Sequence, residues 1–157
     1  MLTDATIALY YLKGLETGLL SLDEVRAWAD GAIAALDAPD PAFIDVALSK
    51  DVPDAVSALH AFAGEGDGSD VGAWLLTLLQ QADVQSWERL SVVIRRAMLV
   101  SKHCGMDDGA YYEFVGIDDK LDLTRNEQYG TVDDCRTDFR VALQRHARPF
   151  PDALGLP

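Results

Sequence analysis

The sequence predicts an all-α fold, a compact single-domain bundle of about six to eight helices that spans residues 1–157. Apolar residues recur at helical spacing along most of the chain. The breaks between these segments contain residues that commonly begin and end helices. The period-two alternation of half-buried strands is rare. A chain of 157 residues, 49% of them hydrophobic, is also long enough to bury a core without disulfides or metals.

Two helices are predicted in the first 40 residues. The first runs from about Asp4 to Thr17, and Gly18 supplies a residue that tolerates the left-handed conformation after a helix. The second is predicted to begin at Ser21, because Ser21 and Glu24 have the spacing of a capping box. The prolines at positions 39 and 41 end this helix, since proline cannot donate the next helical hydrogen bond.

Two more helices are predicted before residue 64. Asp40 caps a short helix that runs from Pro41 to about Leu48. The helix after it has Pro53 in its first turn, where proline is tolerated. Its apolar side comprises Val52, Val56, Leu59 and Phe62.

The glycine-rich stretch 64–68 is expected to separate helices and not domains. Ser69 and Asp70 are predicted to cap the helix that follows it. Ser86 then precedes a long helix, and Gly105 closes that helix.

The last third of the chain gives a weaker helical signal. Asp107 to Phe114 is predicted to form a short helix, and residues 115–131 are predicted to be irregular with one helical turn, because their apolar residues stand among aspartates. Thr131 is predicted to cap the final helix, and the tail from about residue 150 is expected to be loose. The solvent-exposed side of the final helix is predicted to comprise Arg136, Arg140, Arg145 and Arg148.

The charge of the chain argues against several partners. The sequence contains 26 acidic and 13 basic residues, which gives a net charge of −13. Such a charge repels phosphate backbones and anionic headgroups, so we expect neither nucleic acid nor a membrane as a partner. No apolar run has the length of a membrane span, and the first dozen residues lack the basic start of a secretion signal. We therefore expect a cytoplasmic protein.

The sequence contains no catalytic or cofactor motif. A phosphate loop, a dinucleotide fingerprint, a nucleophile elbow and a zinc-protease motif are all missing. Cys104 and Cys135 lack metal-ligand spacing, so both are interpreted as small core residues. His60 is interpreted as a core histidine bonded to a carbonyl group, and no two of the three histidines have ligand spacing. We expect no catalytic residue, no cofactor and no metal.

The acidic residues are unevenly distributed. Residues 1–85 contain 14 acidic and 3 basic side chains, whereas residues 86–157 contain 12 and 10. The acids either keep the chain soluble or attract a cationic protein, and both interpretations stay open. Tyr10 and Tyr11 are expected in the core, whereas Tyr112 is a candidate interface anchor. The candidate partner-binding residues are Asp23, Asp30, Asp37, Asp40, Asp45, Asp107, Asp108, Tyr112, Asp118, Asp119 and Asp122.

Four segments together resemble the small acidic immunity proteins that bacteria encode beside polymorphic or contact-delivered toxins. They are Leu15-Glu-Thr-Gly18, Ser21-x-x-Glu24-Val25-x-x-Trp28-Ala29-Asp30, Pro41-x-x-Ile44-x-x-Ala47-Leu48-Ser49 and Gly116-Ile117-Asp118-x-x-x-Asp122-Leu123. The four segments contain 31 of the 157 residues, and most of these residues are structural. The resemblance implies a protein that binds its toxin without catalysis, and it assigns no contact residue.

The expected function is therefore that of an immunity protein whose acidic surface neutralises a cognate basic toxin. One alternative is a secretion adaptor or chaperone, which binds an extended segment of an effector instead of a folded domain. Another is a small metal-dependent enzyme that uses Asp118, Asp119, Asp122 and a histidine.

Overall fold

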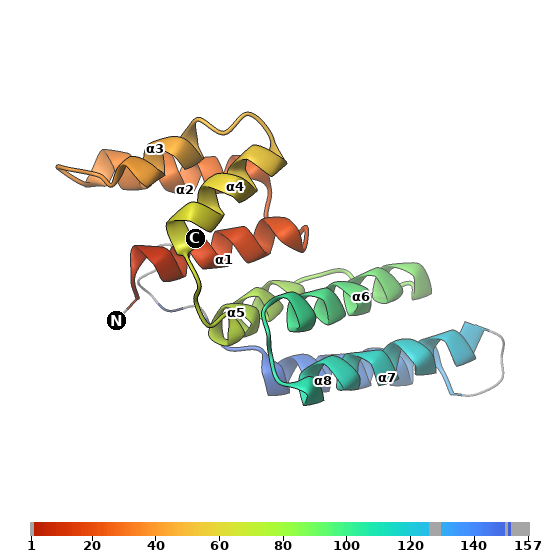
Figure 1. Ribbon diagram of the computed structural model, residues 1–157. Coiled ribbons are helices and arrows are strands. Elements are labelled where there is room, and N and C mark those ends of the chain that lie inside the picture. The colour runs from red at the N-terminus through yellow and green to blue at the C-terminus, as the bar shows by residue number, and fades with distance from the viewer. Residues whose placement is uncertain (1, 126–129, 150, 152–157) are drawn as a thin grey trace. The chain divides into compact units, whose positions relative to one another are not determined.

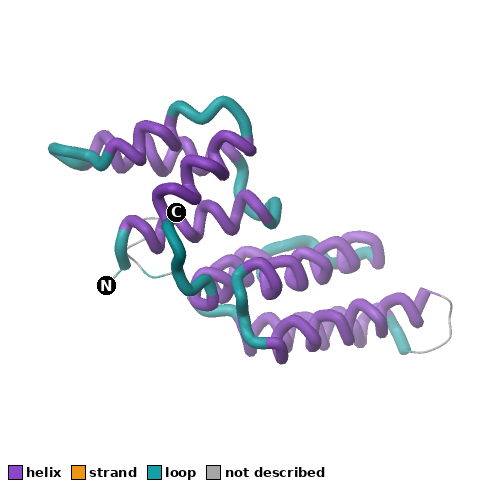
Figure 2. The backbone as a smooth tube through the Cα atoms, viewed as in Figure 1, coloured by secondary structure: helices purple, strands orange, loops and turns teal. Residues whose placement is uncertain are grey.

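The computed structural model describes residues 2–125, 130–149 and 151, and these residues form eight helices and no strand. The predicted all-α fold of six to eight helices is therefore confirmed (Figures 1 and 2). The helices are α1 (Asp4–Glu16), α2 (Leu22–Ala35), α3 (Pro41–Ala47), α4 (Val52–Ala63), α5 (Ser69–Leu79), α6 (Trp87–His103), α7 (Asp108–Arg125) and α8 (Val132–His146).

The chain divides into two compact units. Unit 1 spans Met1–Gly66 and contains α1 to α4, and unit 2 spans Asp67–Pro157 and contains α5 to α8. The boundary falls in the glycine-rich stretch that was expected to separate only helices. The single domain over residues 1–157 stays a prediction. The expected loose tail lies outside the described residues, apart from residue 151.

Unit 1 is held together by an aromatic cluster. Helix α1 packs against α4, and α3 packs against both α2 and α4. The ring of Tyr11 stacks on Trp28 with 4.5 Å between ring centroids, and Phe43 meets Trp28 and Phe62 edge-on at 5.4 and 4.8 Å. Tyr10 is fully buried beside Tyr11, so the prediction that this tyrosine pair packs in the core is confirmed.

Side-chain caps define most helix ends as predicted. The Ser21 hydroxyl accepts from the Glu24 amide at 3.2 Å, and the Glu24 carboxylate accepts from the Ser21 amide at 2.7 Å, which completes the capping box. Asp40, Ser86 and Thr131 also cap the helices expected of them.

The predicted Ser69–Asp70 cap is wrong. Ser69 is the first residue of α5, and Gly68 occupies the N-cap position without a side-chain hydrogen bond. The Asp67 carboxylate instead accepts a hydrogen bond from the Ser69 amide at 2.9 Å. The side-chain acceptor at the start of α5 is therefore Asp67, which precedes the N-cap residue Gly68.

Unit 2 contains the clearest departure from the sequence prediction. Residues 108–125 form one continuous helix, α7, so the predicted short helix and irregular segment up to residue 125 are wrong. Ala110, Phe114, Ile117 and Leu121 are buried at positions i, i+4, i+7 and i+11. One narrow apolar stripe thus continues through the aspartates, and packing against α6 and α8 stabilises it. Of the remaining segment, residues 126–129 lie outside the described residues.

Arg136 is not on the solvent-exposed side of α8, which is a second correction. Its side chain is only 12% exposed. The guanidinium donates to the carbonyl oxygens of Val84 and Gln85 at 2.9 and 2.7 Å, and so holds the segment before α6. Arg140, Arg145 and Arg148 are exposed as predicted.

Candidate partner-binding surfaces

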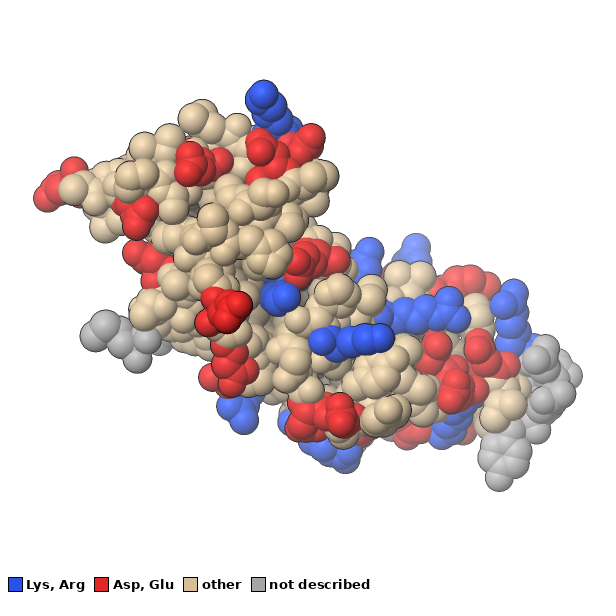
Figure 3. Space-filling view, viewed as in Figure 1, with Lys and Arg blue, Asp and Glu red and all other residues tan. Residues whose placement is uncertain are grey.

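The first candidate surface lies on and beside α2 and α3. Its acidic residues are all exposed, and Figure 3 shows red carboxylates over this part of unit 1. Asp23 and Asp30 are seven residues apart, which places them on one side of α2. We call this area the α2–α3 surface; it comprises Asp23, Asp30, Asp37, Asp40 and Asp45 together with the exposed Leu36, Ile44 and Leu48.

Nearby cations do not neutralise the α2–α3 surface. Residues 1–66 contain 11 acidic and 3 basic side chains. Arg26 donates to the carbonyl oxygen of Ser49 at 3.0 Å and lies 3.8 Å from Asp23. Within the described parts of the chain, Asp30, Asp37 and Asp45 form no ion pair. Their negative potential therefore extends into the solvent.

Exposed apolar side chains accompany these acids. Leu48 is 73% exposed, and Ile44 is exposed one helical turn before it. Phe43 and Val46 on the other side of α3 are buried, so this seven-residue helix has apolar residues on two faces. This exposed apolar face was not predicted, although the apolar residues on both sides of so short a helix indicate it in the sequence.

The acids on and just before α7 form a second group. Asp107, Asp108, Asp119 and Asp122 are exposed as predicted, and continuous α7 brings the last three to one side of the helix. The carboxylate of Asp107 accepts from the Ala110 amide at 3.0 Å. Lys120, on the same helix, pairs with Asp138 at 2.6 Å.

Asp118 differs from the other predicted acids. Its side chain is only 14% exposed, with one oxygen 3.5 Å from the Arg95 guanidinium and the other without a hydrogen-bond partner among the described residues. Desolvation raises the pKa of this carboxyl; Arg95 opposes the shift and Asp122 adds to it. This candidate partner-binding residue therefore presents little of its carboxylate to the solvent.

Tyr112 has the exposure that an interface anchor needs. It is 66% exposed, and its ring meets Tyr111 edge-on at 5.4 Å. The Lys102 ammonium lies 6.0 Å from the centre of the Tyr111 ring. These contacts hold two tyrosines beside α6 with one of them in solvent.

One histidine, His146, is paired with a carboxylate of another helix. His146 lies 2.6 Å from Glu113, which also pairs with Arg145. His146 lines a pocket of about 370 Å³ that also includes Ser69, yet no hydroxyl or thiol in the described segments hydrogen-bonds to His146. Covalent catalysis additionally requires a nucleophile within hydrogen-bonding distance of such an imidazole. No local sequence pattern indicates the pair of Glu113 and His146, because 33 residues separate them.

His60 is exposed and not in the core. Its side chain is 56% exposed, and Nε2 lies 3.3 Å from a Glu16 carboxylate oxygen. The prediction of a core histidine is wrong, because the packing of α4 on α1 turns position 60 outward. Cys104 and Cys135 are both buried, which confirms their interpretation as core residues.

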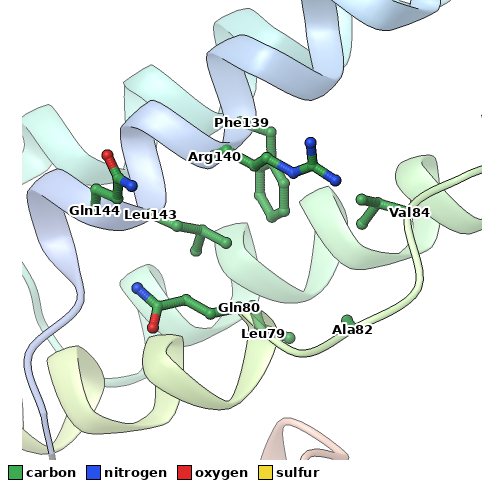
Figure 4. Close-up of a pocket in the computed structure, with 8 residues that line it drawn as sticks. All are labelled: Leu79, Gln80, Ala82, Val84, Phe139, Arg140, Leu143 and Gln144. Carbon is green, nitrogen blue, oxygen red and sulfur yellow. The ribbon is translucent and has the colours of Figure 1, made fainter.

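A shallow pocket of about 300 Å³ lies between the end of α5 and α8. Figure 4 shows Phe139 and Leu143 of α8 facing the segment that carries Leu79 and Ala82. Gln80, Arg140 and Gln144 supply its polar atoms. The pocket offers space for an apolar group but no cluster of catalytic side chains.

Comparison with known proteins gives no match: no family model, no curated protein and no solved structure is significantly similar to this chain. In the described residues, no group of three or more His, Cys, Asp and Glu side chains is arranged to bind a metal ion. No helix among them is long and apolar enough to cross a membrane.

Proposed function

We propose that this chain is a non-catalytic immunity protein of the bacterial cytoplasm, which binds and neutralises a cognate basic toxin. The observation that carries the proposal is the α2–α3 surface, where exposed carboxylates without ion pairs stand beside exposed apolar side chains. That combination is typical of protein interfaces, in which a polar rim surrounds apolar contacts.

The two components of the surface have different roles in this proposal. The unpaired charges of Asp30, Asp37 and Asp45 accelerate the encounter with a cationic protein and disfavour neutral or acidic ones. Leu48 and Ile44 then provide apolar area that leaves water when the complex forms. The acids of α7 are the weaker candidate interface, because Asp118 is partly buried against Arg95.

The pocket of Figure 4 favours one alternative. Its mixed lining of apolar and polar side chains suits a side chain of an extended segment, which is what a secretion adaptor or chaperone binds. The proposed immunity function requires a folded toxin domain instead. Limited proteolysis of the complex separates the two, since an extended partner is cleaved outside the bound segment and a folded toxin is protected.

The test uses the products of the neighbouring genes as toxin candidates. Each is expressed from an inducible promoter with and without this chain, and complexes are co-purified at low and high salt. Rescue of growth together with a salt-sensitive complex supports the proposal. If no neighbouring product is both toxic and bound, the proposal is wrong.

Two matched triple variants then locate the interface. Asp30→Lys, Asp37→Lys and Asp45→Lys change the α2–α3 surface, whereas Asp108→Lys, Asp119→Lys and Asp122→Lys change α7. Both raise the net charge from −13 to −7, so net charge alone cannot distinguish them. We expect the first variant to lose rescue and the second to keep it. Equal effects would contradict the assignment to the α2–α3 surface.

A further inference from the structure

The outer side of α6 carries a charge opposite to that of the whole chain. Four cations, Arg89, Arg95, Arg96 and Lys102, stand on this helix against the single acid Glu88. Figure 3 shows blue side chains gathered where Figure 1 places α6. Arg96 and Lys102 are exposed and form no ion pair in the part of the chain that the structure describes.

This basic side also contains exposed apolar groups and a hollow. Val92 and Leu99 are exposed seven residues apart, so they share one side of α6. A mainly apolar hollow of about 250 Å³ lies beside Leu99 and is lined by Met98, Tyr111, Arg95 and Lys102. We call this area the α6–α7 surface; it comprises Val92, Arg95, Arg96, Met98, Leu99, Lys102, Tyr111 and Tyr112.

We propose that the α6–α7 surface binds α3 of a second copy of this chain. The outer face of α3 presents Ile44 and Leu48 one turn apart, with Asp45 between them and Asp37 before the helix. It is therefore an apolar face among acids, and the α6–α7 surface is an apolar face among cations. Leu48, the most exposed large hydrophobic side chain in the described residues, enters the hollow beside Leu99.

The charge of the chains sets the ionic strength at which this contact forms. Two copies with a net charge of −13 repel each other over long distances. At about 0.15 M salt the Debye length is about 8 Å, so repulsion between whole chains is screened more than ion pairs about 3–4 Å apart. We expect association at that ionic strength, and weaker association at about 1 M salt, where the Debye length of about 3 Å also screens the pairs.

The contact joins two different surfaces and is therefore heterologous. It leaves an unoccupied α3 on one copy and an unoccupied α6–α7 surface on the other, unless the two contacts close a ring. The mass-average molecular weight is therefore expected to rise with concentration. This inference goes beyond the proposed function and does not rest on it.

A charge exchange tests the contact. One variant carries Arg96→Glu and Lys102→Glu, and the other carries Asp37→Lys and Asp45→Lys; all four side chains are exposed and form no ion pair within the described segments. Sedimentation velocity of the full chain measures self-association from micromolar to millimolar concentration. We expect each variant alone to associate at least tenfold more weakly than the wild type, and an equimolar mixture of the two to associate again.

The control carries Arg140→Glu and Asp119→Lys, exposed positions outside both surfaces, and is expected to behave like the wild type. Far-UV circular dichroism verifies that every variant folds. A wild type that stays monomeric from micromolar to millimolar concentration overturns the proposal. Binding of the wild type to anionic lipid vesicles or to an acidic peptide, without self-association, overturns it as well. A mixture that fails to associate overturns it as well. The Arg96→Glu, Lys102→Glu variant keeps the α2–α3 surface, so toxin rescue by this variant tests the proposed function separately.

Discussion

Replacing Leu121 with alanine tests the continuity of α7. Leu121 is fully buried in the stripe that α7 presents to the core of unit 2, and its carbonyl oxygen accepts a hydrogen bond from the Trp87 indole at 3.1 Å. Alanine removes buried carbon atoms and leaves a cavity that the surrounding side chains fill only partly. Such substitutions cost about 2–5 kcal/mol, and full burial in a helix interface places this one near 3 kcal/mol.

Leu123 provides a matched control two residues further along the same helix. Its side chain is exposed, so Leu123→Ala makes no cavity and is expected to change stability by less than about 0.5 kcal/mol. Urea denaturation followed by far-UV circular dichroism measures both variants, and hydrogen exchange of the α7 amides localises the effect to unit 2. If the two substitutions have equal cost, residues 115–125 do not form the buried helix described above.

Three further predictions concern packing and protonation. A methyl group at Gly72 would lie 2.8 Å from the Met106 sulfur, so Gly72→Ala is expected to lower the stability of unit 2 by about 1–3 kcal/mol. A methyl group at Gly116 meets open space within α7, so Gly116→Ala is expected to raise the stability by about 0.5–1 kcal/mol. Thermal melts in which both substitutions shift the stability in the same direction contradict this packing. Burial, with a smaller contribution from Glu24, raises the pKa of Tyr11 to about 12 from 10.0. The unfolded chain therefore loses this proton first as the pH rises, so the contribution of Tyr11 to the stability is fully present below pH 10 and is lost between pH 10 and 12. An absorbance titration that finds Tyr11 ionising near pH 10 refutes this. Desolvation raises the pKa of Asp118, so the folded state takes up this proton at a higher pH than the unfolded state. The wild type should therefore gain stability relative to Asp118→Asn as the pH falls from neutral toward 3.8. A constant difference between the urea midpoints of the two proteins across this range counts against the prediction.

Local signals predicted the helix ends well. The Ser21–Glu24 capping box and the caps at Asp40, Ser86 and Thr131 depend only on residues within one turn of each other. Gly18 adopts a φ of 74°, in the left-handed region that favours glycine, so its place after α1 was also readable locally. Short-range chemistry therefore determined where most elements begin and end.

Contacts between distant residues were the part that the sequence did not reveal. Arg136 bonds to carbonyl groups about 50 residues earlier, and Glu113 meets His146 from another helix. The burial of Asp118 depends on α7 being one continuous helix, because Asp118 then stands four residues after the buried Phe114 and three before Leu121, whereas Asp119 lies on the opposite side. The same limit applies to the candidate surfaces, because the exposure of Leu48 and the hollow beside Leu99 result from packing.

The exposed leucine at the end of α3 affects the solubility of the protein. A side chain such as Leu48, 73% exposed, favours unspecific aggregation when neighbouring molecules approach closely. At low ionic strength a net charge of −13 keeps them apart, so under that condition the acids that are proposed to attract a partner also keep the apolar contact accessible in its absence. This protection disappears near the isoelectric point of about 4.4. We expect a solubility minimum near that pH, which replacement of Leu48 by serine makes shallower.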